Sequence, residues 1–306
     1  MNRLVAIVGP TAIGKSRLAL RLGQEWGGEI VSADSRQVYR GLDIGTAKPA
    51  RHELSLIPHH LVDIINPDED FSLAQYQRLA YQAINDIQER HKLALLVGGS
   101  GLYVWAVLEG WEIPAVPPDA GFRSRLEERA DRGEGDELYR ELLAVDPVAA
   151  GRIDRRNVRR VIRALEVSRQ ARATVSRIQG QKSTLPETLI IGLTAVRAEV
   201  YRRVDLRVNE MIERGLVEEV QRLIEKGYDF NLPSMSGIGY RQVGAFLRGE
   251  IDRPTAAQQI KFETHRYVRQ QYNWFRPGDK RIRWFDITGD NVEAEIMALV
   301  GEFLSR

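Results

Sequence analysis

The sequence predicts an α/β fold in which a parallel sheet flanked by helices is interrupted by an all-helical insertion domain. Three observations support this. Short apolar runs alternate with amphipathic helical segments, a glycine-rich loop joins the first run to the first helix, and the stretch 116–185 carries helical patterns only. Strands that alternate with helices form parallel sheets, because each helix carries the chain back across the sheet. The core is therefore expected at 1–115 and 186–306, with the insertion at 116–185.

The predicted strands are five short runs rich in apolar and β-branched residues. Such runs are typical of strands buried on both faces. Helices are predicted from Ser16 onward and over Leu73–Arg90, where apolar residues recur at helical spacing. The strands are expected at Leu4–Val8, Glu29–Ala33, Leu93–Val97, Ile190–Thr194 and Ile282–Ile287.

The insertion is predicted from a change in pattern after two prolines, Pro117 and Pro118. Asp119 follows them and is a good helix N-cap. Further along, 152–182 holds ten Lys and Arg against two acids, which gives this segment a net charge of +8. Its apolar residues at 158, 161, 162 and 165 form one helical stripe, so the arginines between them are expected on an exposed face. A basic face of this density indicates nucleic-acid contact, although a charge run is commonly just a solvated surface.

Composition excludes several classes of protein. The 306 residues include no cysteine, which rules out disulfides, cysteine-ligated zinc, iron–sulfur clusters and thiol nucleophiles. Net charge is only +2, but 37 of the 44 basic residues are arginine, which binds phosphate with paired hydrogen bonds. A GC-rich genome would give the same bias. The longest uncharged apolar stretch, 93–108, is too short and too glycine-rich to span a membrane, and no signal peptide is visible, so a cytoplasmic protein is expected.

The glycine-rich loop has the spacing G-x-x-x-x-G-K-S of a phosphate loop, with a strand before it and a helix after it. In this context the backbone N–H groups and the helix N-terminus are expected to surround an anion. Lys15 is expected to reach the terminal phosphates, and the Ser16 hydroxyl to hold Mg²⁺. The motif predicts a polyphosphate ligand without saying which one. Its residues are Gly9, Pro10, Thr11, Ala12, Ile13, Gly14, Lys15 and Ser16.

Asp34 is the acidic residue expected to face this loop. Most phosphate-loop enzymes place an acid after a second strand, but the 93–97 strand ends in Gly98-Gly99-Ser100-Gly101. The Glu29–Ala33 strand ends at Asp34 instead, and ligands of such sheets bind at the carboxyl ends of the strands. A carboxylate there can accept a proton from an attacking nucleophile. The alternatives are a helix cap or a group in the magnesium shell.

A series of further motifs resembles the tRNA dimethylallyltransferase family, also called tRNA isopentenyl transferases. The match covers nearly the whole chain, and the run Asp-Ile-Gly-Thr-Ala-Lys-Pro is far more specific than the phosphate loop. The absence of cysteine, which a zinc finger would need, matches the bacterial form. The segments that carry the resemblance are 9–16, 34–49, 58–63, 98–103, 160–167, 215–220, 238–242 and 264–276.

The resemblance implies transfer of a dimethylallyl group from dimethylallyl diphosphate to N6 of adenosine 37, beside the anticodon of tRNA, with release of diphosphate. It implies a P-loop NTPase-like core, Asp34 as the base, and Thr11 and Arg207 as catalytic contacts to the diphosphate, with Mg²⁺ as cofactor. The helix carrying Lys261, His265 and Arg269 is expected to contribute a cationic stripe, because these residues fall at i, i+4 and i+8. The expected tRNA contacts are Asp34, Ser35, Arg36, Gln37, Ser100, Arg123, Arg159, Arg160, Val161, Ile162, Arg163, Gly239, Tyr240, Arg241, Lys261, His265 and Arg269.

Three other functions fit part of the sequence. A small-molecule kinase would use the phosphate loop and Asp34, but it would not need the basic insertion. An isopentenyl transferase acting on free adenine nucleotides would have little use for the +8 segment. An RNA-binding switch that hydrolyses nucleotide would leave its RNA unmodified. No coiled-coil seam is evident, so a monomer without an obligate protein partner is expected, in contact only with tRNA and dimethylallyl diphosphate.

Overall fold

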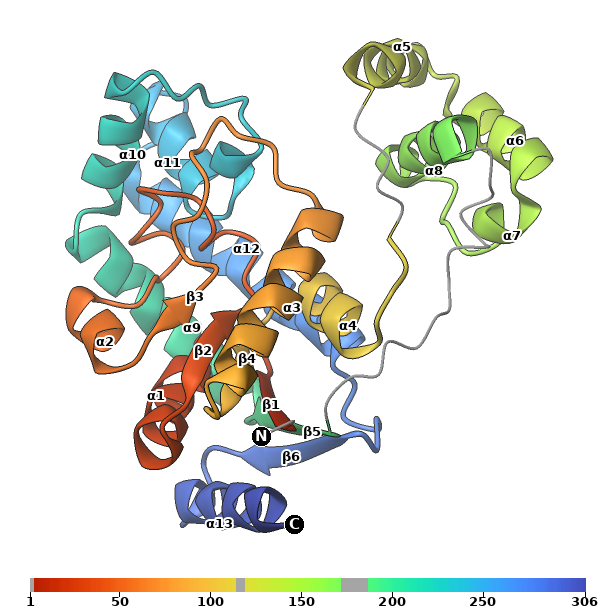
Figure 1. The fold of residues 1–306 in the computed structure, drawn as a ribbon. Coiled ribbons are helices and arrows are strands. Elements are labelled where there is room, and N and C mark those ends of the chain that lie inside the picture. Colours follow the sequence, from red (N-terminus) through yellow and green to blue (C-terminus); the bar gives the residue numbers. More distant parts are fainter. Residues whose placement is uncertain (1–2, 114–118, 172–186) are drawn as a thin grey trace. The chain divides into compact units, whose positions relative to one another are not determined.

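The computed structural model describes residues 3–113, 119–171 and 187–306, and the chain forms two compact units (Figure 1). The first unit comprises Met1–Val107 and Leu185–Arg306, and the second comprises Leu108–Thr184. The predicted insertion at 116–185 falls almost wholly within the second unit. That unit starts eight residues earlier than predicted, at the last residue of a helix of the first unit. Each unit is described by itself below.

The first unit is built on a six-stranded sheet in which every paired strand is parallel, in the order β3-β2-β4-β1-β5-β6. All five predicted strands are present, and the predicted α/β fold class is confirmed. The sequence pattern missed β3, because a strand of two residues has no periodicity to detect. The strands are β1 Arg3–Val8, β2 Glu29–Ser32, β3 His59–His60, β4 Ala94–Val97, β5 Glu187–Thr194 and β6 Ile282–Asp286.

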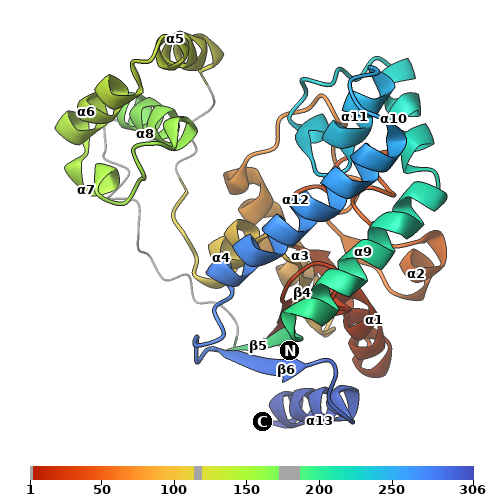
Figure 2. The ribbon, with the colours of Figure 1, turned by 180° about the vertical axis from the view of Figure 1, so that it is seen from behind.

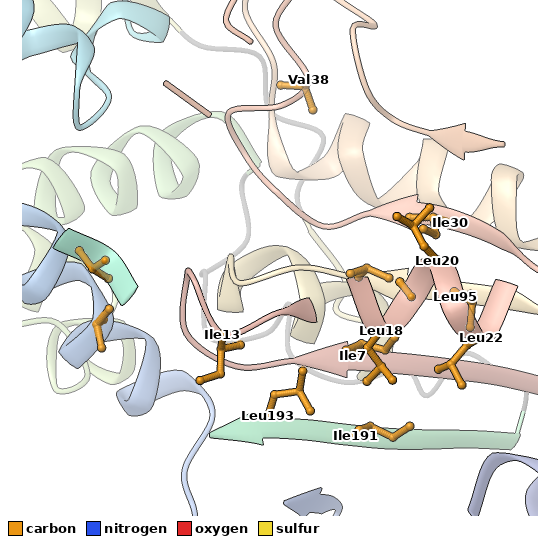
Figure 3. Packing of buried hydrophobic residues seen from close by; sticks show 14 of the residues in the cluster. Ile7, Ile13, Leu18, Leu20, Leu22, Ile30, Val38, Leu95, Ile191 and Leu193 are labelled. Atoms are coloured by element: carbon orange, nitrogen blue, oxygen red, sulfur yellow. The ribbon is translucent and has the colours of Figure 1, made fainter. Parts of the chain in front are cut away.

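One face of the sheet packs against helix α1 (Lys15–Trp26) and helix α13 (Val292–Ser305). Successive side chains of a strand point to opposite faces, so Ile7 shares this face with residues of β4 and β5. In Figure 3, Leu18 and Leu22 of α1 lie over Ile7 and Leu95. This packing holds the first turn of α1, and with it the phosphate loop, at the carboxyl edge of the sheet.

The opposite face is covered by α3 (Leu73–Glu89) and α4 (Gly101–Leu108). The rings of Tyr76 and Tyr103 stack with their centroids 3.8 Å apart. The Tyr76 hydroxyl donates a hydrogen bond of 3.3 Å to the Ser32 carbonyl at the end of β2. Both faces of the sheet are therefore buried, as the apolar strand sequences predict.

Two long helices, α9 (Arg197–Glu213) and α12 (Arg253–Trp274), lie side by side near the carboxyl ends of the strands, as both views show (Figure 2). Helix α9 follows β5 directly, which brings residues of both helices to the same edge as the phosphate loop. The remaining elements of this unit are α2 Arg51–Leu56, α10 Leu216–Glu225, the short 3₁₀ helix η2 Ser234–Ser236 and α11 Tyr240–Leu247.

Glu29 is a buried acid at the start of β2, and its side chain is 2% exposed. Arg90 and Lys92 donate hydrogen bonds to its carboxylate, the latter at 2.8 Å, and His60 Nε2 lies 2.8 Å away. Chiefly the hydrogen bonds from Arg90 hold the pKa of Glu29 well below its usual range. Because Glu29 begins its strand, this cluster lies at the amino end of the sheet, opposite the phosphate loop.

The described part of the second unit, 108–113 and 119–171, contains four helices and no strand, as the sequence predicts. Asp119 caps the first of them by accepting a hydrogen bond of 2.9 Å from the Phe122 N–H. The apolar stripe of the basic segment packs into the core of this unit. No helix in the described ranges is long and apolar enough to cross a membrane. The helices are α5 Ala120–Asp131, α6 Gly135–Val145, α7 Pro147–Ala150 and α8 Val158–Ala171.

Candidate active site

The phosphate loop connects β1 to α1 in a conformation that depends on its glycines. Gly9 has φ +135°, and a Cβ there would collide with the Leu193 carbonyl oxygen of β5. Gly14, with φ +101°, is the N-cap of α1. Both are conformations that a side chain disfavours. The loop therefore wraps closely against β5 and presents the helix N-terminus, where an anion is stabilised.

Lys15 is partly buried inside this loop. Its ammonium group donates hydrogen bonds to the carbonyl oxygens of Gly9 at 3.0 Å and Pro10 at 2.7 Å. Burial, and secondly the positive charge of Arg207, lower the pKa of Lys15 from 10.5 to about 7, while Asp34 acts in the opposite direction. A negatively charged ligand in the loop would raise this pKa, because its charge attracts the ammonium group and offsets the repulsion from Arg207.

Arg207 reaches the phosphate loop from the middle of α9. Its Nη1 donates a hydrogen bond of 3.1 Å to Thr11 Oγ1, across 196 residues of sequence. Burial lowers the pKa of Arg207, and the charge of Asp34 partly offsets this effect. Guanidinium groups remain protonated in proteins, so Arg207 brings a permanent positive charge to the loop. The structure thus places the two predicted diphosphate contacts, Thr11 and Arg207, side by side.

Asp34 lies just beyond β2, at the same edge of the sheet. Its Oδ1 atom accepts hydrogen bonds from the backbone N–H of Arg36 at 2.8 Å and of Gln37 at 3.4 Å. One oxygen therefore caps a turn, a role close to the helix cap that the sequence left open as an alternative. In the described ranges no residue donates a hydrogen bond to Oδ2, so the carboxylate retains a free oxygen to accept a proton.

Two cavities of the first unit meet at these residues. One has a volume of about 450 Å³ and follows the phosphate loop, and the other has a volume of about 310 Å³ and lies between α9, α12 and the 236–240 loop. Thr11, Asp34 and Arg207 line both. The junction between the cavities therefore holds a carboxylate, a hydroxyl and a guanidinium.

The two cavities differ in chemistry. The first is lined by the phosphate loop and by the cations Lys15, Arg203 and Arg207, which suits a polyanion. The second has a wall of apolar side chains from the two helices, Val204, Val208, Met211 and Ile260, facing polar residues of the 34–46 and 236–240 segments. A ligand that spans the junction would have a charged part and an apolar part.

Comparison with known proteins identifies the family to which this architecture belongs. A family model described as IPP transferase matches residues 37–278. The chain is 49% identical over 302 residues to a tRNA dimethylallyltransferase of Dehalococcoides mccartyi. That alignment covers 99% of this chain and 93% of the relative. It is 50% identical over 279 residues to a tRNA dimethylallyltransferase of Roseiflexus sp., covering 90% of each. The chain belongs to the IPP transferase family.

A solved structure supports the same assignment. The crystal structure of the full-length tRNA isopentenylpyrophosphate transferase from Bacillus halodurans superposes with a TM-score of 0.73 at 38% identity. The alignment covers 100% of this chain and 97% of that one. The predicted membership of the tRNA dimethylallyltransferase family, in the form found in bacteria, is therefore confirmed.

The structure brings three residues to the site that sequence reasoning did not single out. Gln271, on α12, hydrogen-bonds to Thr11 and Gly99. Tyr267 lines both cavities, and burial raises its pKa to about 12. Glu219, buried on α10, accepts hydrogen bonds from three successive backbone N–H groups at 43–45 and from the Tyr240 hydroxyl. Glu219 lies within the 215–220 motif, but no neighbouring residue in the sequence indicates what its carboxylate binds.

Glu219 explains why the Asp-Ile-Gly-Thr-Ala-Lys-Pro run forms a fixed wall of the site. Its carboxylate holds the turn that places Thr46 in both cavities. Gly45 packs against the Tyr240 ring and has no room for a Cβ. Lys48 completes the turn through ion pairs with Asp43 at 2.7 Å and with Asp63.

Of the predicted tRNA contacts that follow β2 and β4, those at 34–37 line the cavities and Ser100 does not. Most of them form hydrogen bonds within the protein. Ser100 is buried and accepts a hydrogen bond of 3.1 Å from the Ser35 N–H. Arg36 donates to the Pro233 carbonyl at 2.6 Å, and Gln37 donates to two carbonyl oxygens of the 43–49 run. Their roles toward RNA stay predictions, and the structure adds that they tie the loops of the site together.

The predicted contacts on α11 and α12 differ in how free they are. Gly239 and Tyr240 line the second cavity, with the Tyr240 side chain buried, whereas Arg241 is exposed. His265 is not a free member of a cationic stripe, because its ring stacks on Tyr201 and its Nε2 lies 2.9 Å from Asp205 Oδ1. Arg269 remains exposed but donates to the Tyr201 hydroxyl at 2.9 Å, and Lys261 is partly exposed.

In the second unit the structure separates the predicted contacts into surface and core. Arg159 and Arg160 are exposed on α8. Val161 and Ile162 form the apolar stripe of α8 and are buried in the core of this unit, which corrects the expectation that their side chains contact RNA.

Arg123 and Arg163 are ordered by a buried acid. Both form ion pairs with Glu166, whose side chain has no exposed surface, and their own side chains are 37% and 39% exposed. Arg123 binds it with two nitrogens at 2.9 and 2.8 Å. These pairs hold the two guanidinium groups at fixed positions, each still partly open to solvent.

Few protein oxygens surround the phosphate loop, so the predicted magnesium ion would be bound mainly by the phosphate ligand and water. Over the described ranges, no cluster of three or more His, Asp or Glu side chains is arranged to hold a metal. Ser16 is exposed at the start of α1 and lines the first cavity with Asp34. Magnesium commonly takes one or two protein oxygens and completes its shell with phosphate and water.

Proposed function

We propose that this protein transfers a dimethylallyl group from dimethylallyl diphosphate to N6 of adenosine 37 in tRNA, and releases diphosphate. The observation that carries the proposal is the junction of a cationic and a partly apolar cavity at Thr11, Asp34 and Arg207. The family of the chain supports it, because the named relatives are tRNA dimethylallyltransferases. The donor has the two parts that the cavities require: a diphosphate and a five-carbon apolar tail.

Asp34 takes the proton from the acceptor in this mechanism. The adenine N6 lone pair is delocalised into the ring, so the nitrogen becomes a nucleophile only as it loses a proton. The turn capped by Oδ1 fixes the carboxylate at the junction, and Oδ2 accepts the proton as the C–N bond forms. The electron pair of the allylic C–O bond leaves with the diphosphate.

The departing diphosphate is stabilised by groups that are already in place. Arg207 and Thr11 lie where the two cavities join, so they would contact the diphosphate beside the allylic C–O bond, and Lys15 with the loop N–H groups would surround the terminal phosphate. Fixed charges and dipoles of this kind act most strongly where charge develops. When bound, Mg²⁺ held through Ser16 would neutralise part of the diphosphate charge.

The tRNA would be held by the arginines of the second unit and by the edge of the first. The +8 segment and the exposed Arg159 and Arg160 support a phosphate-backbone contact. A base that reacts in a cavity must leave its stack, and the anticodon loop is single-stranded, which lowers that cost. We further propose that the enzyme works as a monomer in the cytoplasm, where its tRNA substrate is found.

The deciding experiment is the mass of an unmodified tRNA that carries adenosines at positions 36 to 38. The tRNA is incubated with the full chain, Mg²⁺ and dimethylallyl diphosphate, beside a control with ATP alone. A gain of one dimethylallyl group on one adenosine, absent in the control, is expected. No gain, together with ATP consumption in the control, would replace the proposal with a kinase or a nucleotide-hydrolysing switch.

A further inference from the structure

Two glycines, Gly98 and Gly99, follow strand β4 beside the phosphate loop, where most enzymes with such a loop carry an acid for the magnesium shell. Gly98 has no room for a side chain, and at Gly99 the room is taken by a side chain of α12. A Cβ on Gly98 would collide with the Ala33 carbonyl oxygen, and a Cβ on Gly99 would collide with Nε2 of Gln271. The space that a side chain of residue 99 would take is therefore filled by an amide from α12.

Both ends of the Gln271 amide are used. Its Oε1 accepts a hydrogen bond of 2.9 Å from the Thr11 N–H, and its Nε2 donates one of 3.0 Å to the Gly99 carbonyl oxygen. The residue is 2% exposed. A single buried side chain thus joins the phosphate loop to the loop after β4.

Thr11 connects Gln271 to Arg207 at the junction of the cavities. Thr11 accepts the hydrogen bond of Arg207 through its side chain while Gln271 holds its backbone. A carboxylate could not replace the amide, because it has no hydrogen to donate to the Gly99 carbonyl and would add negative charge beside a polyanion. The position therefore requires an uncharged side chain with both a donor and an acceptor.

We infer that Gln271 is a positioning residue for the reaction: its amide fixes Thr11, and through Thr11 the Arg207 guanidinium, at the junction of the two cavities. Gln271 acts through Thr11, because both polar atoms of its amide are bonded to the backbone. Its amide fills the space beside Gly99, near where other phosphate-loop enzymes carry an acid for magnesium. Unlike that acid, the amide fixes the loop without adding negative charge. The kinetic test below rests on the proposed function, because it measures dimethylallyl transfer. The test of diphosphate binding does not.

The test is the pH dependence of Gln271→Glu, measured as kcat and KM for dimethylallyl diphosphate at saturating tRNA. At pH 8.5 the ionised carboxylate loses the bond to Gly99, and kcat/KM is expected to fall about 20-fold or more. At pH 6 more of the carboxyl is protonated, and the protonated form donates to the Gly99 carbonyl oxygen and accepts from the Thr11 N–H as the amide does. The ratio of variant to wild type is then expected to recover at least about fivefold.

Two further variants separate positioning from packing. Gln271→Met keeps the length of the side chain and loses both bonds, so its deficit is expected at every pH. Gln88→Met is the matched control, because Gln88 also donates through Nε2 to a backbone carbonyl, that of Arg3 at 3.1 Å, at the opposite edge of the sheet. Its kcat/KM is expected to equal that of wild type, with any loss confined to the melting temperature.

The inference is overturned if Gln271→Glu matches wild type within about twofold, or if its deficit is independent of pH and equals that of Gln271→Met. Calorimetric titration with inorganic diphosphate gives a readout that needs no turnover, and the same pH pattern is expected in Kd. If wild type makes no modified tRNA, the proposed function fails while this binding test still decides the role of Gln271. If Gln271→Glu does not fold, the comparison of Gln271→Met with Gln88→Met in diphosphate affinity decides it.

Discussion

The affinity of the phosphate loop for a diphosphate should depend on the protonation of Lys15. In the free protein, burial and the charge of Arg207 lower the pKa of Lys15 to about 7, so much of it is neutral under ordinary conditions. A bound diphosphate brings negative charge against the ammonium group and raises that pKa. Binding therefore takes up a proton above pH 7, and affinity falls as pH rises.

The size of the effect follows from the pKa. At pH 8.5 about 3% of Lys15 is charged in the free protein, so the affinity is expected to be about 30-fold weaker than at pH 6, as long as the pKa in the complex stays above 8.5. The ligand titrates as well, and its second ionisation opposes this trend. A variant with a neutral residue of similar length, Lys15→Met, experiences the ligand's titration alone. The ratio of the two dissociation constants isolates the lysine.

The assay is calorimetric titration of the full chain with dimethylallyl diphosphate, without tRNA, between pH 6 and 8.5. The ratio Kd(Lys15→Met)/Kd(wild type) should be largest at pH 6 and about 30-fold smaller at pH 8.5, with most of the fall above pH 7. Lys226→Met, a change at an exposed lysine on the surface, should leave the wild-type profile unaltered. A ratio that stays constant across this range would show that Lys15 does not titrate there and would refute the reasoning.

Three further outcomes are expected. Asp34→Asn retains an oxygen to cap the turn but cannot take a proton, so single-turnover transfer should fall about 100-fold or more while tRNA affinity and melting temperature stay the same, and normal turnover would remove Asp34 as the base. Glu29→Gln should lower the free energy of unfolding in urea at neutral pH by about 2–3 kcal/mol, less than for a fully buried pair because its cations are partly hydrated. Since the pKa of Glu29 is lowered on folding, this difference is fully present above its unfolded value of 4.5 and shrinks as pH falls below it, and a difference that grows toward acid would contradict the assignment. Arg159→Ala with Arg160→Ala should weaken tRNA binding and reduce the salt dependence of log K by about 1.4–1.8, whereas Arg140→Ala on α6 should change neither.

Much of the fold could be predicted because it depends on patterns of apolar residues that are close together in the sequence. The strands that flank the phosphate loop are apolar on both faces, and a helix follows the loop at once, so Lys15 and Ser16 could be placed at a helix N-terminus from sequence alone. The apolar stripe of α8 could likewise be predicted, but spacing and motif position gave its residues different roles. The same apolar spacing that predicts a helix requires Val161 and Ile162 to be core residues, and motif position alone cannot distinguish them from the exposed arginines beside them.

The contacts that complete the site could not be predicted in this way. Gln271 lies 260 residues from Thr11, and Glu219 lies 175 residues from the Ile44 N–H that it binds. In the sequence each is one polar residue on an amphipathic helix. His265 shows the converse, because helical spacing places it in a cationic stripe while α9 supplies the aspartate and tyrosine that bind it.

The sequence by itself determined the parallel α/β core, the phosphate loop and its lysine, the helical character of the insertion and the family of the chain, because each depends on residues close together or on motifs in a fixed order. Only the tertiary structure decided that Thr11, Asp34 and Arg207 meet where two cavities join, and that an amide from α12 fills the place of the missing acid. The physical reason is that these contacts join the carboxyl edge of the sheet to two helices from distant parts of the chain. Their geometry is set by the packing of the whole unit, which no local pattern records.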